Sequence, residues 1–211
     1  MKKTLRICLF ISLVLISPML AAMEENYCGE LHGHHFGPFD YLNRFNLKGQ
    51  LDVVEQYHFN SDVENLISGM SASVGADLDY TLRAWPNHHR ALTALAKLSL
   101  RDKTSRPRGT KWPVECYFDR AIRMRSDDGT VRMIYGGYLS KIEKPNQAIE
   151  QLEIAVKLMP DSATAHYNLG LLYFDKKNYS KAKVHAEKAY ALNFPLPGLR
   201  NRLKKIGKWS D

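Results

Sequence analysis

Residues 163–195, ATAHYNLGLLYFDKKNYSKAKVHAEKAYALNFP, decide the fold, because the pattern in this stretch recurs further upstream. Ala121, Ala155 and Ala189 stand 34 residues apart. A period of this length is typical of helical hairpins that stack into a solenoid. The sequence therefore predicts an all-α protein built from pairs of antiparallel helices.

Small residues recur where two helices of a hairpin would cross. Gly170 and Ala182 are small at the expected crossing in residues 163–195, and Gly136 and Ala148 hold the same two places one period earlier. Small side chains let helix backbones approach closely, while larger neighbours fill the space around the contact. The two stretches are therefore expected to form the same structural unit.

These two repeats resemble the tetratricopeptide repeat, and the resemblance covers about residues 76–207. Arg132 and His166 depart from the family pattern, in which tryptophan is common at that position. The N-terminal block, including residues 79–84 (DYTLRA) and 86–92 (PNHHRAL), also resembles a group of exported bacterial tetratricopeptide proteins that have no defined activity. The resemblance implies a helical-hairpin solenoid that recognises a protein or peptide on its concave face.

The chain is expected to divide into three parts. Residues 1–22 begin with Lys2 and Lys3, continue through an apolar run and end in Ala21 and Ala22, a pattern typical of a secretory signal peptide. We therefore expect a periplasmic or secreted protein after cleavage near Ala22.

The remaining two parts are an arm and the solenoid. Residues 23–60 are expected to form an irregular arm rich in cysteine, histidine and aromatic residues, and residues 61–211 to form the TPR-like solenoid. A Ser-x-x-Glu pattern at Ser61 and Glu64 predicts that Ser61 caps the first helix. The expected units of the solenoid are a degenerate leading repeat (61–87), a repeat with an inserted loop (88–128), two regular repeats (129–162 and 163–195) and a C-terminal capping helix (196–211).

The inserted loop, around residues 104–113, is basic and ends near Trp112. Its Pro and Gly residues resist helix formation. Two interpretations are open: a loop that projects and contacts a partner, or a solvated loop that the tryptophan anchors.

Composition and motifs narrow the classes of function. The formal net charge of +8 falls to about +5 once the signal peptide is removed, which is mild basicity. No nucleophile elbow, phosphate-binding glycine loop or metalloprotease helix motif is present, so we expect no enzyme. After the signal peptide no apolar run is long enough to span a membrane, and export makes nucleic acid an unexpected partner.

The resemblance implies which side chains line the concave face, because the first helix of each repeat contributes them. The implied groove changes from basic to aromatic along the chain and would accept an extended peptide with an acidic end and an apolar anchor. The carboxylate clamp known in the family is not reproduced: Asn168 matches one clamp position, but Met133 and Gly137 do not match its neighbours. Alternatively, Met133, Leu171 and Phe174 pack against neighbouring helices. The candidate groove residues are Arg90, Lys97, Arg101, Met133, Lys141, Tyr167, Asn168, Leu171 and Phe174.

Cys28 and Cys116 are the cysteines left after signal cleavage. An oxidising compartment makes such a pair a candidate disulfide, which would tie the arm to the repeats and contribute at most about 4 kcal/mol. Two buried thiols are the alternative. The disulfide is inferred from compartment and count alone.

A histidine cluster in the arm raises an alternative function. His32, His34 and His35 lie close together in the sequence, and imidazoles at this density suit zinc, copper or nickel. The spacing matches no zinc-site signature, and an irregular arm that packs on the first helices explains the same residues. Apart from this candidate transition metal, no cofactor is expected.

Overall fold

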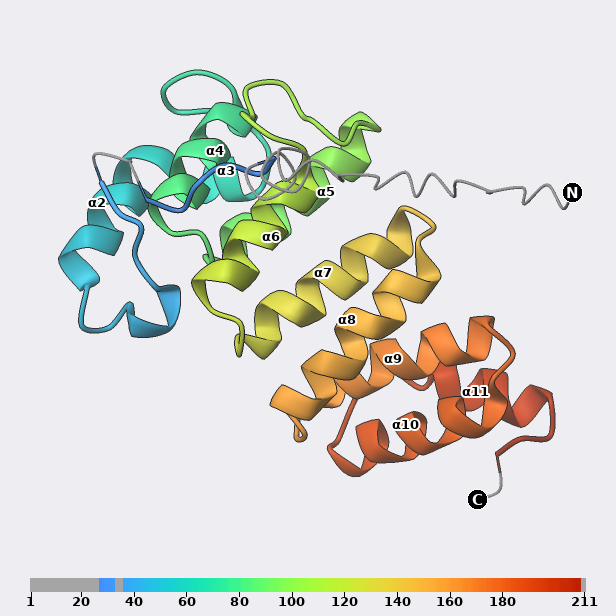
Figure 1. Cartoon of the computed structure of the whole chain (residues 1–211). Helices are drawn as coiled ribbons and strands as arrows, with labels where there is room; N and C mark the ends of the chain where they lie inside the picture. The colour runs from blue at the N-terminus through green and yellow to red at the C-terminus, as the bar shows by residue number, and fades with distance from the viewer. Residues whose placement is uncertain (1–26, 33–35, 210–211) are drawn as a thin grey trace, which may run out of the picture.

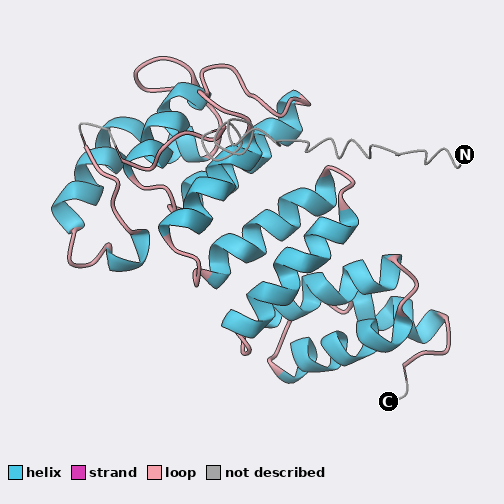
Figure 2. Cartoon of the chain, viewed as in Figure 1, coloured by secondary structure: helices cyan, strands magenta, loops and turns pink. Residues whose placement is uncertain are grey.

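The structure is a computed structural model that describes residues 27–32 and 36–209, and its regular elements within these ranges are all helical (Figures 1 and 2). The all-α prediction is therefore confirmed. The expected signal peptide, together with His34 and His35, lies outside the described residues. In chain order the elements are η1 (Tyr41–Asn43), α2 (Lys48–His58), α3 (Ser61–Glu64), α4 (Val74–Ala84), α5 (His89–Asp102), α6 (Val114–Met124), α7 (Gly129–Lys141), α8 (Pro145–Leu158), α9 (Ala163–Asp175), α10 (Tyr179–Ala191) and α11 (Gly198–Lys205).

Successive helices stack as hairpins in two layers. Helix α7 packs along α8, and α9 along α10, with α8 joining the two hairpins through its contact with α9. Helices α3, α5, α7, α9 and α11 follow one another as neighbours and form an inner layer, and α4, α6, α8 and α10 belong to the outer one (Figure 1). The predicted helical-hairpin solenoid is thus confirmed.

The first helix of each regular hairpin, α7 or α9, begins and ends in the same way. Asp128 and Ser162, 34 residues apart, cap α7 and α9 by accepting hydrogen bonds from backbone N–H groups of the first turn. Glu143 and Lys177, also 34 residues apart, adopt left-handed backbone conformations (φ 59° and 61°) just after the same helices. A left-handed residue ends a helix and directs the chain into the next one, so the repeat reproduces its turns without glycine.

The small residues of the period lie at close helix contacts. A methyl group added to Gly136 would be 2.7 Å from Cγ of Leu152, on α8. One added to Gly170 would be 2.6 Å from Cδ2 of Leu199, on the capping helix α11. Real Cβ atoms do not approach other atoms this closely, so these glycines permit the observed packing.

His166 stands where tetratricopeptide repeats often have tryptophan, and it forms a histidine pair in the α9–α10 hairpin. Its Nδ1 is 3.0 Å from Nδ1 of His185, and its Nε2 is 3.0 Å from the carbonyl oxygen of Pro160. A carbonyl only accepts, so Nε2 of His166 donates to Pro160, and in the neutral pair Nδ1 of His185 donates to His166. The pKa of His185 is lowered to about 4, mainly by burial and to a smaller extent by the neighbouring His166.

The N-terminal arm is less irregular than expected. Helix α2 falls within residues 23–60 and packs on α4, with Val54 and Phe59 buried. No side chain caps the start of α2, so the usual sequence signal is missing. The expected cap at Ser61 is also wrong, because Asn60 accepts the backbone hydrogen bonds that open α3.

The inserted loop is fastened to α4. The hydroxyl of Ser73, at the start of α4, donates to the carbonyl oxygen of Arg108 over 3.1 Å. The backbone N–H of Lys111 donates to the carboxylate of Asp79 over 3.0 Å, and the Tyr117 hydroxyl donates to the same oxygen. These contacts favour the anchored loop over the projecting one.

Candidate concave binding groove

Two cavities lie along the inner layer of helices. The first cavity, of about 270 Å³, lies between α5 and α7, with Arg90 and Lys97 on one side and Met133 on the other. The structure thus brings these three predicted residues together, and Thr93 and Thr130 lie beside them in the lining. The remaining lining residues are Glu64, His89, Ala94 and Ile134.

The second cavity, of about 290 Å³, lies further along the same layer. Lys141 from α7 and Asn168 and Leu171 from α9 line it, so three more predicted residues are brought together. Arg202 from α11 closes one side and forms an ion pair with Asp175. Because α7 contributes to both cavities, they are consecutive along one face.

Arg90 enters the first cavity already paired. Its guanidinium forms an ion pair with Glu64 and lies 3.3 Å from Oε1 of Glu55. The hydrogen bond from Arg90 lowers the pKa of Glu64, and the hydrogen bond from His88 lowers that of Glu55. Two carboxylates therefore compensate the charge of Arg90, and Lys97, which is exposed, is the cation better placed to attract an acidic ligand.

Two adjacent histidines position the start of α5 beside this cavity. Nδ1 of His88 accepts from the backbone N–H of Ala91, so its Nε2 carries the proton that is donated to Glu55. Burial lowers the pKa of His88. His89 contacts Asp128, the cap of α7, through Nε2 at 2.8 Å, which ties the two inner helices together at the cavity wall.

The aromatic end of the predicted groove is covered by the chain's own C-terminal segment. Tyr167 is only 8 % exposed, and its ring stacks on Phe194 with centroids 4.0 Å apart. The guanidinium of Arg202 lies 4.2 Å from the ring centroid of Phe174. The expectation that these two rings present open aromatic surface is therefore wrong, because the segment after α10 folds back onto them.

Arg101 also lies apart from both cavities. Its guanidinium donates to the carbonyl oxygen of Leu66 and to the side chain of Asp102. It therefore fastens the loop after α3 to the end of α5.

The charged or titratable side chains Glu64, His89 and Arg202 also line the cavities, and the sequence does not predict them there. Glu64 belongs to the Ser-x-x-Glu pattern, which indicates a helix start and not a groove, and no sequence motif marks His89. Arg202 has a detectable signal, since α11 continues the series of inner helices, and extending the repeat register into residues 196–211 places that helix beside α9.

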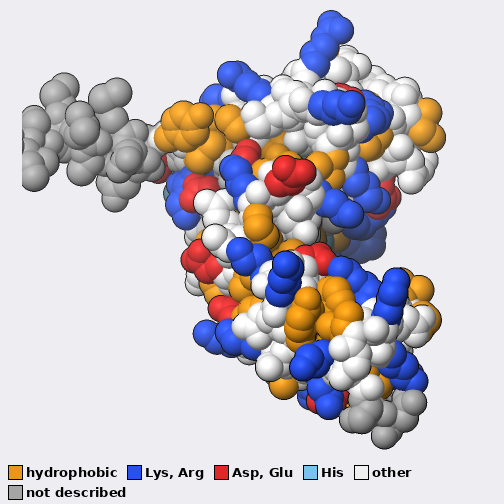
Figure 3. Space-filling model, turned by 90° about the vertical axis from the view of Figure 1, so that its right-hand side faces the viewer, with side chains coloured by type: hydrophobic (Ala, Val, Ile, Leu, Met, Phe, Trp, Pro, Cys, Tyr) orange, Lys and Arg blue, Asp and Glu red, His pale blue; other side chains and the backbone are white. Residues whose placement is uncertain are grey.

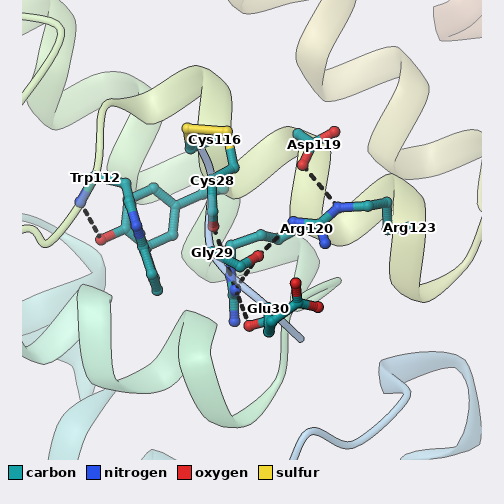
Figure 4. The surroundings of a disulfide bond; sticks show 9 residues. Cys28, Gly29, Glu30, Trp112, Cys116, Asp119, Arg120 and Arg123 are labelled. Atoms are coloured by element: carbon teal, nitrogen blue, oxygen red, sulfur yellow. Dashed lines mark hydrogen bonds and ion pairs between the residues drawn. A yellow bond between two sulfur atoms is a disulfide. The ribbon is translucent and has the colours of Figure 1, made fainter. Parts of the chain in front are cut away.

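The N-terminal arm is held on α6 (Figure 4). The sulfur atoms of Cys28 and Cys116 lie 2.03 Å apart and their Cα atoms 4.9 Å apart. Nη1 of Arg120 donates to the carbonyl oxygens of Cys28, Gly29 and Glu30, over 3.4, 3.2 and 2.6 Å. The same guanidinium lies over the ring of Trp112, 4.5 Å from its centroid, so the inserted loop and the arm share one anchor.

The candidate metal ligands are not brought together by the described structure. His32 is exposed, and His34 and His35 lie outside the described residues. Within residues 27–32 and 36–209, no group of three or more His, Cys, Asp or Glu side chains is placed to hold a metal ion.

Two family models match the C-terminal half of the chain. One, described as a TPR repeat, matches residues 143–177, and another, described as a tetratricopeptide repeat, matches residues 163–194. The chain contains tetratricopeptide repeats. Together these matches cover α8, α9 and α10, in the part of the chain where the 34-residue period is clearest.

Solved structures share the fold of these tetratricopeptide repeats. The structure of Pseudomonas aeruginosa pilF aligns with a TM-score of 0.53 and 22 % identity, over 76 % of this chain and 69 % of that one. A crystal structure of MamA protein aligns with a TM-score of 0.52 and 18 % identity, over 75 % of this chain and 83 % of that one. A search of curated proteins found no match. In the described part of this tetratricopeptide-repeat chain, no helix is long and apolar enough to cross a membrane.

Proposed function

We propose that this protein is an exported, non-enzymatic scaffold that binds an extended segment of a partner protein along its inner helices and helps to hold an envelope complex together. The observation that carries the proposal is the pair of consecutive cavities that share α7. An extended segment spanning both would bury side chains in each. Export is inferred from the pattern of residues 1–22.

The lining of each cavity favours a particular kind of contact. In the first, Ala94, Met133 and Ile134 offer an apolar floor for one side chain, and Lys97 attracts a carboxylate beside it. In the second, the amide of Asn168 can bind a peptide backbone group, and Lys141 adds a second cation. We therefore propose a partner segment with an apolar anchor and at least one acidic residue.

The proposed export also bears on the cysteines. We propose that Cys28 and Cys116 are oxidised in the exported protein, because the periplasm and the extracellular space favour disulfides. The bond would then fasten the N-terminal arm to α6, next to the contacts of Arg120. The arm would be a fixed part of the scaffold.

The function is tested by affinity for a partner captured in cells. The partner is identified by crosslinking and mass spectrometry, and its dissociation constant is measured with purified proteins. The variant Lys97→Ala/Met133→Ala should weaken binding at least about tenfold, since a buried anchor and its charge partner are typical hot spots. The matched control is Lys157→Ala/Val184→Ala, on the exposed surface of the outer helices α8 and α10. Equal affinity of both variants and the unchanged protein would refute binding in this groove.

A further inference from the structure

The positive charge of the protein is concentrated at its C-terminal end. Residues 163–211 contain ten Lys or Arg and three Asp or Glu, a net charge of +7. Residues 23–162 contain 17 basic and 19 acidic residues, a net charge of −2. The last repeat and its capping helix therefore carry the whole excess. Figure 3 shows Lys and Arg side chains gathered around apolar ones on the lower part of the molecule, where these helices lie.

A large open cavity lies within this basic region. Its volume is about 680 Å³, and it is bounded on one side by the turn from α9 into α10 and on the other by residues 207–209, which follow α11. Its lining contains four lysines and two aromatic residues: Lys176, Lys177, Lys183, Lys208, Tyr179 and Trp209. We call this set the basic basin. It lies apart from both cavities of the concave groove.

One wall of the basic basin is held in place by packing. The ring of Trp209 meets that of Tyr190 edge to face, with centroids 5.7 Å apart. The guanidinium of Arg200 lies over both rings, 4.1 Å from the centroid of Tyr190 and 5.4 Å from that of Trp209. These contacts fix the indole at the edge of the basin before any ligand arrives.

Exposed apolar side chains flank the capping helix. Leu196 precedes α11 and is 58 % exposed, and Ile206 follows it and is 39 % exposed. Arg200, Arg202, Lys204 and Lys205 lie between them. A short basic helix with apolar side chains at both ends and an aromatic neighbour has the composition of a surface that lies in the headgroup region of a membrane.

We propose that the basic basin and the capping helix α11 form a docking surface for anionic lipid headgroups, so that the scaffold binds the surface of a membrane peripherally. The lysines attract the headgroup phosphates, while Leu196, Ile206 and Trp209 enter the interfacial layer. Clusters of four to eight basic residues on an amphipathic helix typically bind anionic lipid in this way. This inference does not depend on the concave groove or on its partner.

A lipid surface explains features that an acidic protein segment leaves unexplained. The basic region spreads over two helices and a turn, and within it ten basic residues stand against three acidic ones. Within the described residues, Lys183 alone of the four basin lysines forms an ion pair, with Glu187 at 3.6 Å. At a membrane interface the exposed Leu196 and Ile206 can be buried at the boundary of the headgroups, while the basic side chains contact anionic lipid.

The test measures co-sedimentation of the full-length mature protein with vesicles. One set is phosphatidylcholine alone, and the other contains about 30 % phosphatidylglycerol. The protein should bind only the anionic vesicles, and binding should fall between about 0.1 M and about 0.5 M NaCl, because salt screens surface charge. Each lysine near a charged membrane contributes about fivefold, so Lys176→Glu/Lys177→Glu/Lys208→Glu should bind at least about 100-fold more weakly.

A matched control separates the basic basin from net charge. Lys103→Glu/Arg108→Glu/Lys157→Glu changes the net charge by the same amount at exposed positions away from the basin, and it should keep most of the binding. Thermal unfolding of both variants checks that they remain folded. Equal binding by the two variants, or equal binding to neutral and anionic vesicles, would overturn the proposal. Binding of soluble poly-glutamate without binding of anionic vesicles would overturn it in favour of an acidic protein partner.

Discussion

Replacing Gly136 by alanine is expected to destabilise the protein, whereas the same change at the next residue, Gly137, is expected to stabilise it. Both glycines lie inside α7. A methyl group at Gly136 would be 2.7 Å from Cγ of Leu152 and 3.1 Å from the carbonyl oxygen of Ala148, both on α8. A methyl group at Gly137 would have no atom within 4 Å apart from its chain neighbours and the backbone of its own helix. The pair therefore isolates the helix contact from helix propensity.

The two effects have opposite signs at Gly136. Alanine stabilises the interior of a helix by about 0.5–1 kcal/mol relative to glycine, because it has less backbone entropy to lose. Overpacking a close contact costs about 1–3 kcal/mol, and Leu152 is only 1 % exposed, so it has little room to move away. We expect a net loss of about 1 kcal/mol at Gly136, against a gain of about 0.5–1 kcal/mol at Gly137.

Urea unfolding followed by circular dichroism measures both changes, provided that the slope of the transition is unchanged. The two variants should differ in free energy of unfolding by roughly 1.5–2 kcal/mol. Equal stabilisation by both substitutions would contradict a close contact at Gly136, since it would mean that α7 and α8 do not approach as closely as the 34-residue period requires.

Three further predictions concern the arm, the histidine pair and the cysteines. Arg120→Met should release the N-terminal arm and speed hydrogen exchange of the amides near residue 30, because it removes the donor that three carbonyl groups share. For His185, a folded-state pKa of about 4 against an ordinary 6.5 means that the unfolded chain binds the proton more tightly. The contribution of neutral His185 to the free energy of unfolding is therefore present at neutral pH and is lost as the pH falls from 6.5 towards 4. The loss amounts to about 2 kcal/mol between about pH 7 and about pH 5. His185→Gln should remove that part of the pH dependence of urea unfolding, and an unchanged dependence would contradict the assignment. Intact-mass analysis of exported protein under non-reducing conditions should show Cys28 and Cys116 unreactive towards alkylating agents; full alkylation without prior reduction would contradict the bond.

The sequence predicts the C-terminal hairpins well because their determinants are local. Gly136 and Gly170 mark the helix crossings, and Asp128 and Ser162 cap α7 and α9, the helices that contain these glycines. Each of these residues acts within one hairpin or on its direct neighbour. The residues that line the two cavities follow from the same repeat register, which is why most of the candidate groove residues converge there.

The N-terminal part and the aromatic end of the groove depend on contacts between distant segments. Helix α2 has no capping side chain and is held by Val54 and Phe59 packing within the fold. Asp79 fastens the inserted loop through Lys111, a contact across 32 positions that no local pattern reveals. Tyr167 is covered because Phe194 turns back onto it, and composition alone does not indicate that turn.

The most direct test of the scaffold is photocrosslinking in the cell with a benzophenone amino acid at single positions. Thr93, which lines the first cavity, and Ser140, which lines the second, report on the concave groove, and Val184, exposed on α10, is the outer control. We expect Thr93 and Ser140 to crosslink to the same partner protein and Val184 not to crosslink to it. Capture of that partner from Val184 alone, or of unrelated proteins from the two groove positions, would contradict a single segment lying along the inner helices.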